Sequence, residues 1–119
     1  MLNRAQLRER ASTRVVATKD VETSFGLAVR IKQLNLLERD EFQLAAFGEN
    51  GKLEKDLMKG NKARLIAMCL VDPEANDSSF ADEEMIVAAF TVVEIDELFR
   101  ACFDFNGLGK DAKEEAAGN

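Results

Sequence analysis

Residues 63–85 read ARLIAMCLVDPEANDSSFADEEM. Within this stretch, positions 65–71 carry no polar side chain, and they are followed at once by Asp72 and Pro73. An apolar run of this kind predicts a buried central helix over residues 63–71. Proline disfavours the α region for the residue before it, so we expect the helix to end there. The rest of the chain must then supply the elements that cover this helix.

The acidic residues after the apolar run fit two interpretations. Positions 1, 3, 5 and 12 of a calcium-binding loop would be Asp72, Glu74, Asn76 and Glu83. Such a loop needs glycine at position 6, where this chain has Asp77, and its position 9 would be Phe80. We therefore interpret the stretch as a turn whose Asp and Ser residues cap the next helix, beginning near Asp82.

A helix and a β-hairpin are predicted at the start of the chain. Residues 1–11 can form a short helix capped by Asn3, with Leu7 as its one strong apolar anchor. Apolar residues alternate with polar ones on both sides of Gly26, which predicts a hairpin over residues 15–34 with this glycine in the turn. A two-stranded hairpin is not stable alone, so its apolar face should lie on helices.

Further helices are predicted between the hairpin and the apolar run. Asn35 and Glu38 have the spacing of a helix N-cap, and the helix that they begin should end near Gly48. Residues 53–71 are mostly helical by propensity, with a break at Gly60. In the first of these helices, the apolar residues that we expect to face the core are Leu37, Leu44 and Phe47.

The last helix has a strongly amphipathic pattern. Thr91 and Glu94 form a capping box, and Phe90 with Ile95 has the spacing of a hydrophobic staple. Gly107 and then Gly109 should end the helix. One arc carries its apolar residues, which are Val92, Ile95, Leu98, Phe99, Cys102, Phe103 and Phe105.

These patterns predict a mainly α fold (α+β), in which a small N-terminal β-hairpin packs on a compact bundle of about four helices. A chain of 119 residues has the length of one domain, which we place at residues 1–108. Residues 109–119 have no apolar anchor beyond alanine, and we expect them to be a mobile C-terminal tail.

The composition excludes most catalytic chemistry. The chain has no histidine, so it cannot build a Ser-His-Asp or Cys-His nucleophile or a common zinc site. It also lacks a glycine-rich phosphate loop, and we expect no enzyme activity, catalytic residue, metal or cofactor. Cys69 and Cys102 lie in apolar runs, and we expect no signal peptide, so they are interpreted as buried free thiols in a reducing compartment. No apolar run approaches the roughly 18 residues of a membrane span.

Charge is unevenly distributed along the chain. Residues 1–32 contain seven basic and three acidic residues, whereas residues 71–99 contain nine acidic residues and no basic one. The net charge of −6 argues against nucleic acid as a partner. Two oppositely charged ends suit head-to-tail contacts or a basic protein partner, and a solvated charged face is the simpler interpretation.

Phenylalanine supplies all the aromatic rings of the chain, with eight Phe and no Trp or Tyr. Five of them lie between positions 80 and 105. We nominate Phe99, Phe103 and Phe105 as candidate partner-binding residues. A place in the core is the simpler interpretation of their helical spacing, and a hydrophobic docking surface stays open.

Several of these patterns, in their order along the chain, resemble the tail assembly chaperones of long-tailed, lambda-like bacteriophages (siphophages). The resemblance rests on the hairpin and on four later motifs: LNLLERD (34–40), ARLIAMCLVD (63–72), FADEE (80–84) and LFRACFDFNGL (98–108). It covers about three quarters of the chain. Two departures are Ala81, where the family often has a Thr or Ser cap, and the longer basic N-terminal segment.

The resemblance implies a non-enzymatic morphogenesis factor that binds and solubilises the tape measure protein and helps to recruit tail tube subunits. It implies action in the host bacterial cytoplasm and absence from the mature virion. Members commonly make a longer form by a programmed −1 ribosomal frameshift, for which Gly109 and Lys110 are the candidate position here, and through which the tail tube protein would be a partner. Self-association into a homo-oligomer suits a protein that coats a long client.

The alternative, drawn from the residues alone, is a small nucleic-acid-associated or regulatory protein that uses the basic N-terminal region. Salt-sensitive DNA binding would favour this alternative. A client with long helices would favour the chaperone.

Overall fold

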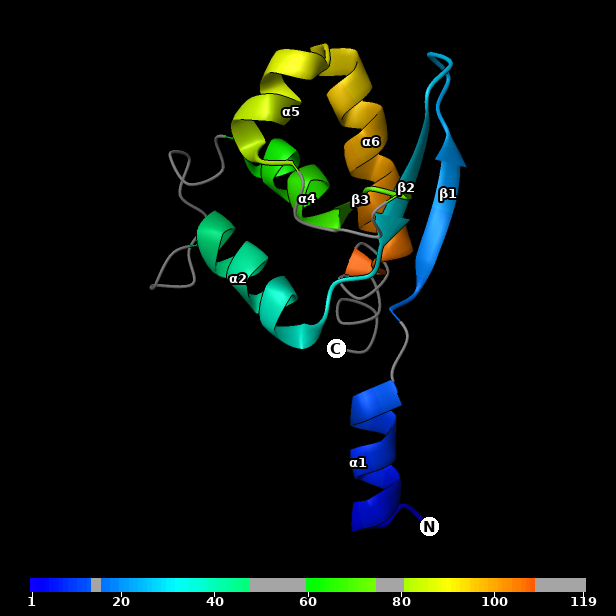
Figure 1. The fold of residues 1–119 in the computed structure, drawn as a ribbon. Coiled ribbons are helices and arrows are strands. Elements are labelled where there is room, and N and C mark those ends of the chain that lie inside the picture. The colour runs from blue at the N-terminus through cyan, green and yellow to red at the C-terminus, as the bar shows by residue number, and fades with distance from the viewer. Residues whose placement is uncertain (14–15, 48–59, 75–80, 109–119) are drawn as a thin grey trace, which may run out of the picture.

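The computed structural model describes residues 1–13, 16–47, 60–74 and 81–108 of the chain (Figure 1). The elements are, in order, α1 (Arg4–Thr13), β1 (Thr18–Glu22), β2 (Ala28–Lys32), α2 (Leu36–Phe47), α4 (Asn61–Cys69), β3 (Leu70–Val71), α5 (Glu83–Ala89) and α6 (Val92–Phe105). The predicted fold class is confirmed, because the described chain is mainly helical with a small antiparallel sheet that starts with an N-terminal hairpin. The tail predicted at residues 109–119 and the turn near Gly48 lie outside the described residues.

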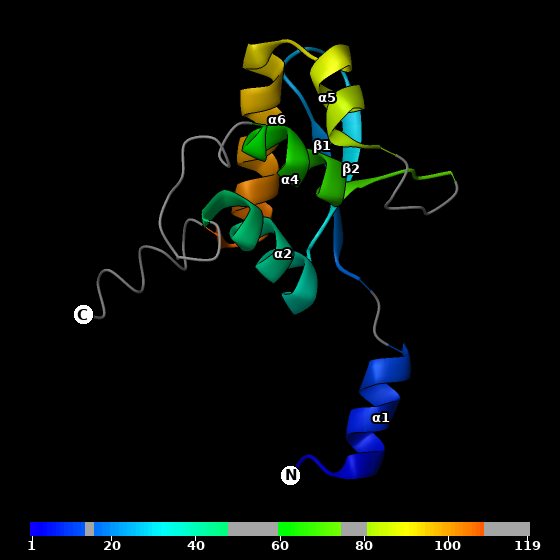
Figure 2. The same ribbon diagram turned by 90° about the vertical axis from the view of Figure 1, so that its left-hand side faces the viewer.

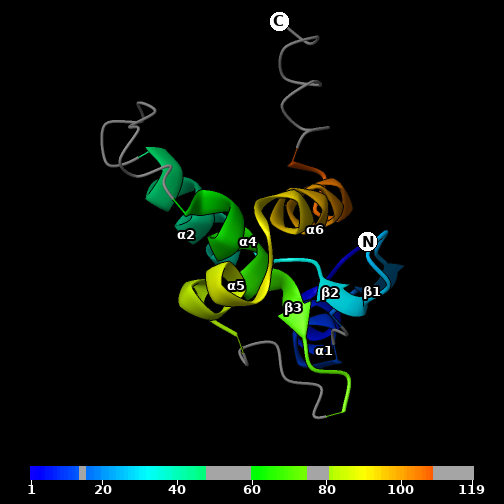
Figure 3. The same ribbon diagram turned by 90° about the horizontal axis from the view of Figure 1, so that it is seen from above.

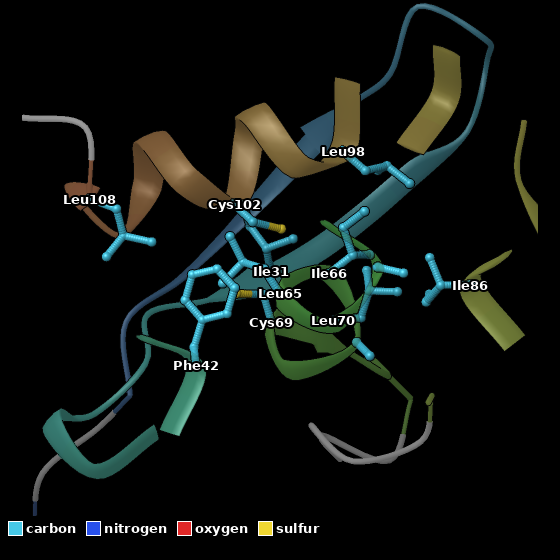
Figure 4. Packing of buried hydrophobic residues seen from close by; sticks show 12 residues of the cluster. Ile31, Phe42, Leu65, Ile66, Cys69, Leu70, Ile86, Leu98, Cys102 and Leu108 are labelled. Atoms are coloured by element: carbon cyan, nitrogen blue, oxygen red, sulfur yellow. The ribbon is translucent and has the colours of Figure 1, made fainter. Parts of the chain in front are cut away.

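Helix α4 is the centre of the fold, as its apolar run predicts. Leu65 and Ile66 are fully buried, and the helix packs against α2, α5 and α6 (Figures 3 and 4). Gly60, which precedes the helix, has a positive φ of 79°, consistent with the predicted break. Because neighbours cover it on several sides, α4 can be apolar almost all round.

The predicted end of this helix at Val71 is wrong by two residues. Helix α4 stops at Cys69, and Leu70 turns to an extended conformation with φ −64° and ψ 136°. Leu70 and Val71 then pair with Ile31 and Arg30 as strand β3. The buried backbone of these residues finds hydrogen-bond partners on β2, so the apolar run leaves the helix before Pro73 is reached.

The sheet has the order β1-β2-β3, and both of its strand pairs are antiparallel. The hairpin predicted over residues 15–34 is confirmed, with register running from Thr18 opposite Lys32 to Glu22 opposite Ala28. Gly26 has a φ of 81° in the turn. Ile31 is fully buried in the core (Figure 4), so β2 supplies the apolar contact that holds the hairpin on the helices.

Helix α2 begins where expected but buries a different residue. Asn35 and Glu38 cap it reciprocally, through bonds of 2.8 Å and 3.0 Å between each backbone N–H and the other side chain. Leu37 and Leu44, predicted to face the core, are 78% and 61% exposed, whereas Phe42 is buried. Both leucines lie roughly 140–160° around the helix from Phe42, and α2 presents one narrow face to α4. The side chain of Phe47 lies outside the described residues.

Helix α6 follows its predicted pattern except at its first turn. Its capping box is present: the backbone N–H of Glu94 donates to Thr91 Oγ1 at 3.2 Å, and that of Thr91 donates to Glu94 Oε1 at 2.9 Å. Leu98 and Cys102 are buried. Val92 was expected on the buried arc but is 76% exposed, because it lies roughly 120° around the helix from the buried Leu98.

Asn106 joins the end of α6 to the rest of the core. Its Oδ1 accepts from the backbone N–H of Leu34 at 2.7 Å, and its Nδ2 donates to the carbonyl of Cys102 at 2.8 Å. The same Nδ2 lies 3.5 Å from the Sγ of Cys69 in α4. One side chain thus ties the exit of the hairpin to α4 and α6. Gly107, at φ 68°, then ends the helix.

Helix α1 stands away from the body of the molecule (Figures 1 and 2). Asn3 caps it as predicted, through reciprocal backbone-to-side-chain bonds of 2.9 Å and 3.0 Å with Gln6. Leu7 was expected to anchor it, but Leu7 is 57% exposed and α1 has no buried residue. Its side-chain hydrogen bonds are all local: Asn3 with Gln6 at the start, and the Ser12 and Thr13 hydroxyls to the Glu9 carbonyl at the end.

Two leucine-to-alanine variants compare a buried leucine of the central helix with an exposed leucine on the outer face of α2. Leu65→Ala removes a fully buried side chain and should lower the free energy of unfolding by about 2–5 kcal/mol. Leu44→Ala, the matched control, should change it by less than about 0.5 kcal/mol. Chemical denaturation measures both, and similar losses for the two variants would contradict this assignment of the core.

Candidate functional site

The clearest candidate site is an apolar groove between β2 and α5, over the end of β3. Figure 3 shows β3 lying between these two elements. The groove has a volume of about 310 Å³. The side chains of its apolar walls include Leu27, Val29, Val71, Met85, Ala89 and Phe90. We call this feature the β2–α5 groove.

The groove exists because β3 is short. Strand β3 pairs with β2 only at Arg30 and Ile31, so the tip half of β2 extends beyond it. Pro73, which also lines the groove, has no N–H and cannot continue a strand ladder. Helix α5 then packs on α4, which leaves apolar side chains facing one another across open space.

Several apolar side chains at the groove are open to solvent. Leu27 is 43% exposed on the hairpin, and Met85 is 52% exposed on α5. At the hairpin turn, the ring of Phe25 packs edge-on against that of Phe90, with 6.2 Å between centroids. The groove is therefore bounded by an aromatic pair at one end and offers uncovered apolar area along its length.

Among the described residues, no acidic side chain lines the groove. Arg30 lines it, but its guanidinium forms two hydrogen bonds with Asp20, of 2.6 Å and 3.0 Å. This hydrogen bonding lowers the pKa of the Asp20 carboxyl, so the ion pair persists at neutral pH. Three exposed carboxylates, Glu74, Asp82 and Glu84, are next to lining residues in the sequence, but they do not line the groove.

The hairpin wall of the groove is fixed to α6 by Glu97. The backbone N–H of Ser24 donates to Glu97 Oε2 at 2.7 Å, and the Ser24 hydroxyl donates to the other carboxylate oxygen. These two bonds, the hydroxyl first, lower the pKa of Glu97. No local sequence pattern indicates this contact, because its partners lie 73 residues apart in the chain.

The three nominated phenylalanines do not line the β2–α5 groove. Phe99 and Phe103 contact each other, with ring centroids 5.4 Å apart, and Lys62 Nζ lies 5.8 Å from the Phe99 centroid. Phe105 lies roughly 160° around the helix from Phe103, so the three rings do not share one face of α6. All three are partly buried and pack against the core. Their role as partner-binding residues stays a prediction.

Cys69 and Cys102 are free and fully buried, as predicted. Hydrogen bonding with Cys69, together with burial, raises the pKa of the Cys102 thiol. A thiol held in its neutral form is a poor nucleophile. We therefore assign these residues to packing between α4 and α6 (Figure 4).

A second hollow is polar and contains two ion pairs. Lys32 Nζ lies 2.8 Å from Glu38 Oε2, and Arg64 Nε lies 2.7 Å from Glu83 Oε1. Burial raises the pKa of Glu38, but bonds from Lys32 and the Asn35 N–H outweigh it, so the net shift is downward. These ion pairs connect β2 to α2 and α4 to α5, so we assign them to holding the fold together.

Most remaining positions singled out in the sequence give no site. Among the described residues, no group of three or more carboxylates or cysteines is placed to hold a metal ion. Asn76, Asp77 and Phe80 of the calcium-loop register lie outside those residues, as do Gly109 and Lys110. In the described part of the chain, no helix has both the length and the apolar character needed to span a membrane.

Comparison with protein-family models, with curated proteins and with solved structures finds no match for this chain. The class that the fold defines is a small α+β domain with an open apolar groove.

The two hydrogen bonds between Ser24 and Glu97, which we call the Glu97 clamp, predict how the stability of the protein depends on pH. Glu97→Gln can keep only one of the two bonds to Ser24, so at pH 7 the variant should unfold at lower denaturant concentration than the wild type. The lowered pKa of Glu97 means that its contribution is present above the unfolded-state pKa of about 4.3 and is lost as pH falls through the folded value. The difference between the two proteins should therefore shrink below about pH 4.

Denaturation of both proteins from pH 7 to pH 3 tests this, with Asp104→Asn on the same helix as the control. A difference that stays constant over the whole pH range would show that the carboxylate is not the stabilising group.

Proposed function

We propose that this protein is a tail assembly chaperone of a long-tailed bacteriophage, which binds and solubilises the tape measure protein without any enzymatic step. Two observations support the proposal. The ordered motifs of residues 34–108 resemble that family, and the β2–α5 groove offers a surface on which a client can bury apolar side chains.

The groove is the single observation that carries the proposal. A client rich in long helices exposes apolar stripes until it is assembled, and such stripes aggregate in water. An amphipathic helix can lay its apolar face in a hydrophobic groove, and Leu27 and Met85 are open to receive it. The net charge of −6 helps to keep the bound complex in solution.

The further parts of this function follow from the resemblance. A frameshift at Gly109 and Lys110 would add a second segment that recruits the tail tube protein. The protein would act in the host bacterial cytoplasm and would be absent from the finished virion. The nucleotide sequence at these two codons tests the frameshift directly, because slippage requires a heptamer of the GGGAAAG type.

Co-expression with the phage tape measure protein tests the leading proposal. The wild-type protein should keep the client soluble and co-purify with it. Met85→Glu places a charge in the groove and should reduce the co-purified client roughly tenfold, since burying an unpaired charge is costly. Leu37→Glu is the matched control, because Leu37 is 78% exposed on α2 and does not line the groove.

Phe103→Ala, tested in parallel, examines the nominated aromatic face. An insoluble client with the wild-type protein, including its frameshifted form, would refute the chaperone function. If the client stays soluble with Met85→Glu and with Leu37→Glu but not with Phe103→Ala, the binding surface lies on α6 instead.

A nucleic-acid-associated protein is the second candidate, and the exposure of the arginines of α1 favours it. On the chaperone proposal, the protein should show no salt-dependent binding to a labelled duplex oligonucleotide. An affinity that falls steeply with added salt, and that Arg4→Ala weakens, would support the second candidate.

A further inference from the structure

One wall of the β2–α5 groove is formed by the turn end of the hairpin, residues 22–28, which we call the hairpin tip. Strand β3 pairs with β2 only at Arg30 and Ile31, so in the described part of the chain the strands beyond these residues pair only with each other. A two-stranded ribbon is marginally stable at best in water. Leu27 of the tip lines the groove and is 43% exposed, so burial alone does not fix its position.

An aromatic contact and the Glu97 clamp connect the hairpin tip to the helices. The rings of Phe25 and Phe90 meet edge-on at one end of the groove, with 6.2 Å between centroids. In the clamp, the backbone N–H of Ser24 donates to Glu97 Oε2 at 2.7 Å, and its hydroxyl donates to Oε1. Hydrogen bonds to a carboxylate are roughly twice as strong as those between neutral groups. Two such bonds to one carboxylate fix the direction of the tip as well as its distance from α6.

Glu97 acts on the groove from outside it. It lies on α6 and does not line the groove. Helix α6 begins at Val92, two residues after Phe90, which lines the groove at the end of α5. Figures 1 and 2 show the hairpin turn and the junction of α5 with α6 at the same end of the molecule. The clamp therefore connects the hairpin wall of the groove, through α6, to the α5 wall.

We propose that Glu97 is a positioning residue of the β2–α5 groove: through Ser24 it holds the hairpin tip, and with it Leu27, where an apolar segment of the client binds. This inference rests on the proposed function, which makes the client the occupant of the groove. Binding to a wall that is already in place avoids the cost of ordering that wall. Without the clamp, the binding-competent position is only partly populated, and the apparent dissociation constant rises in proportion.

Binding of a neutral apolar dye, Nile red, tests the proposal without the client. Met85→Glu locates the site, because a charge in the groove should abolish the dye binding that occurs there. Ser24→Ala loses the hydroxyl bond of the clamp, and Glu97→Gln can keep only one of the two bonds. Each should raise the dissociation constant of the dye roughly threefold to tenfold. Ser24→Thr retains a hydroxyl and should restore the affinity of the wild type.

Asp104→Asn is the matched control, because it removes one negative charge from an exposed position on the same helix. Dye binding is measured where every variant is folded, so a role in stability alone would leave the dissociation constant unchanged. Equal dye affinity in Ser24→Ala, Glu97→Gln and this control would overturn the proposal. Dye binding that Met85→Glu does not affect would also overturn it, because the clamp would then hold no groove ready for an apolar ligand.

The same variants, co-expressed with the tape measure protein, distinguish this proposal from the proposed function. Ser24→Ala and Glu97→Gln should retain less client than the wild type, in the order found with the dye. If the wild type binds the dye in the groove and the clamp variants weaken it, but no client binds, the chaperone function fails and the positioning role of Glu97 stands. If the client binds equally well to the wild type and to both clamp variants, the chaperone function stands and the positioning role is overturned.

Discussion

The fold depends on the burial of α4 on almost every side. A helix with Leu65, Ile66, Ala67 and Cys69 all buried cannot lie at a surface, so other elements have to enclose it. Helices α2, α5 and α6 do so, and β3 continues the same apolar run directly into the sheet. The short length of β3 follows from the same run, because the apolar residues end at Val71 and the charged turn begins one residue later.

The local signals in the sequence predicted the starts of elements well. Asn3, Asn35 and Thr91 each cap a helix through a residue three positions away, and such bonds require only the sequence nearby. The widths of the buried faces were harder to predict. Leu37, Leu44 and Val92 fit an apolar pattern but remain exposed, because a periodic pattern shows that a face is apolar without showing how much of it a neighbour covers.

The candidate site could not be predicted for a related reason. The β2–α5 groove takes its walls from three separate segments, and each of them looks like ordinary core in isolation: alternation around Val29, the end of the apolar run at Val71, and helical spacing of Met85 with Ala89. The clamp from Ser24 to Glu97 joins positions 73 residues apart. The high density of phenylalanines near the end of the chain instead pointed to Phe99 and Phe103, which are partly buried and pack against the core.

An open apolar groove and a stable small domain coexist here because the groove shares its floor with the core, at Leu70 and Ile86, and only its rim is open. Stability rests on α4 with Ile31, Leu98 and Cys102 around it, whereas the open rim is formed by side chains such as Leu27 and Met85. The hairpin wall does not need the groove to be filled, because Glu97 holds its turn and Asn106 holds its exit. The net charge of −6 opposes indiscriminate aggregation through the exposed apolar area. A wall that these bonds already hold in place needs little further ordering when an apolar segment enters the groove.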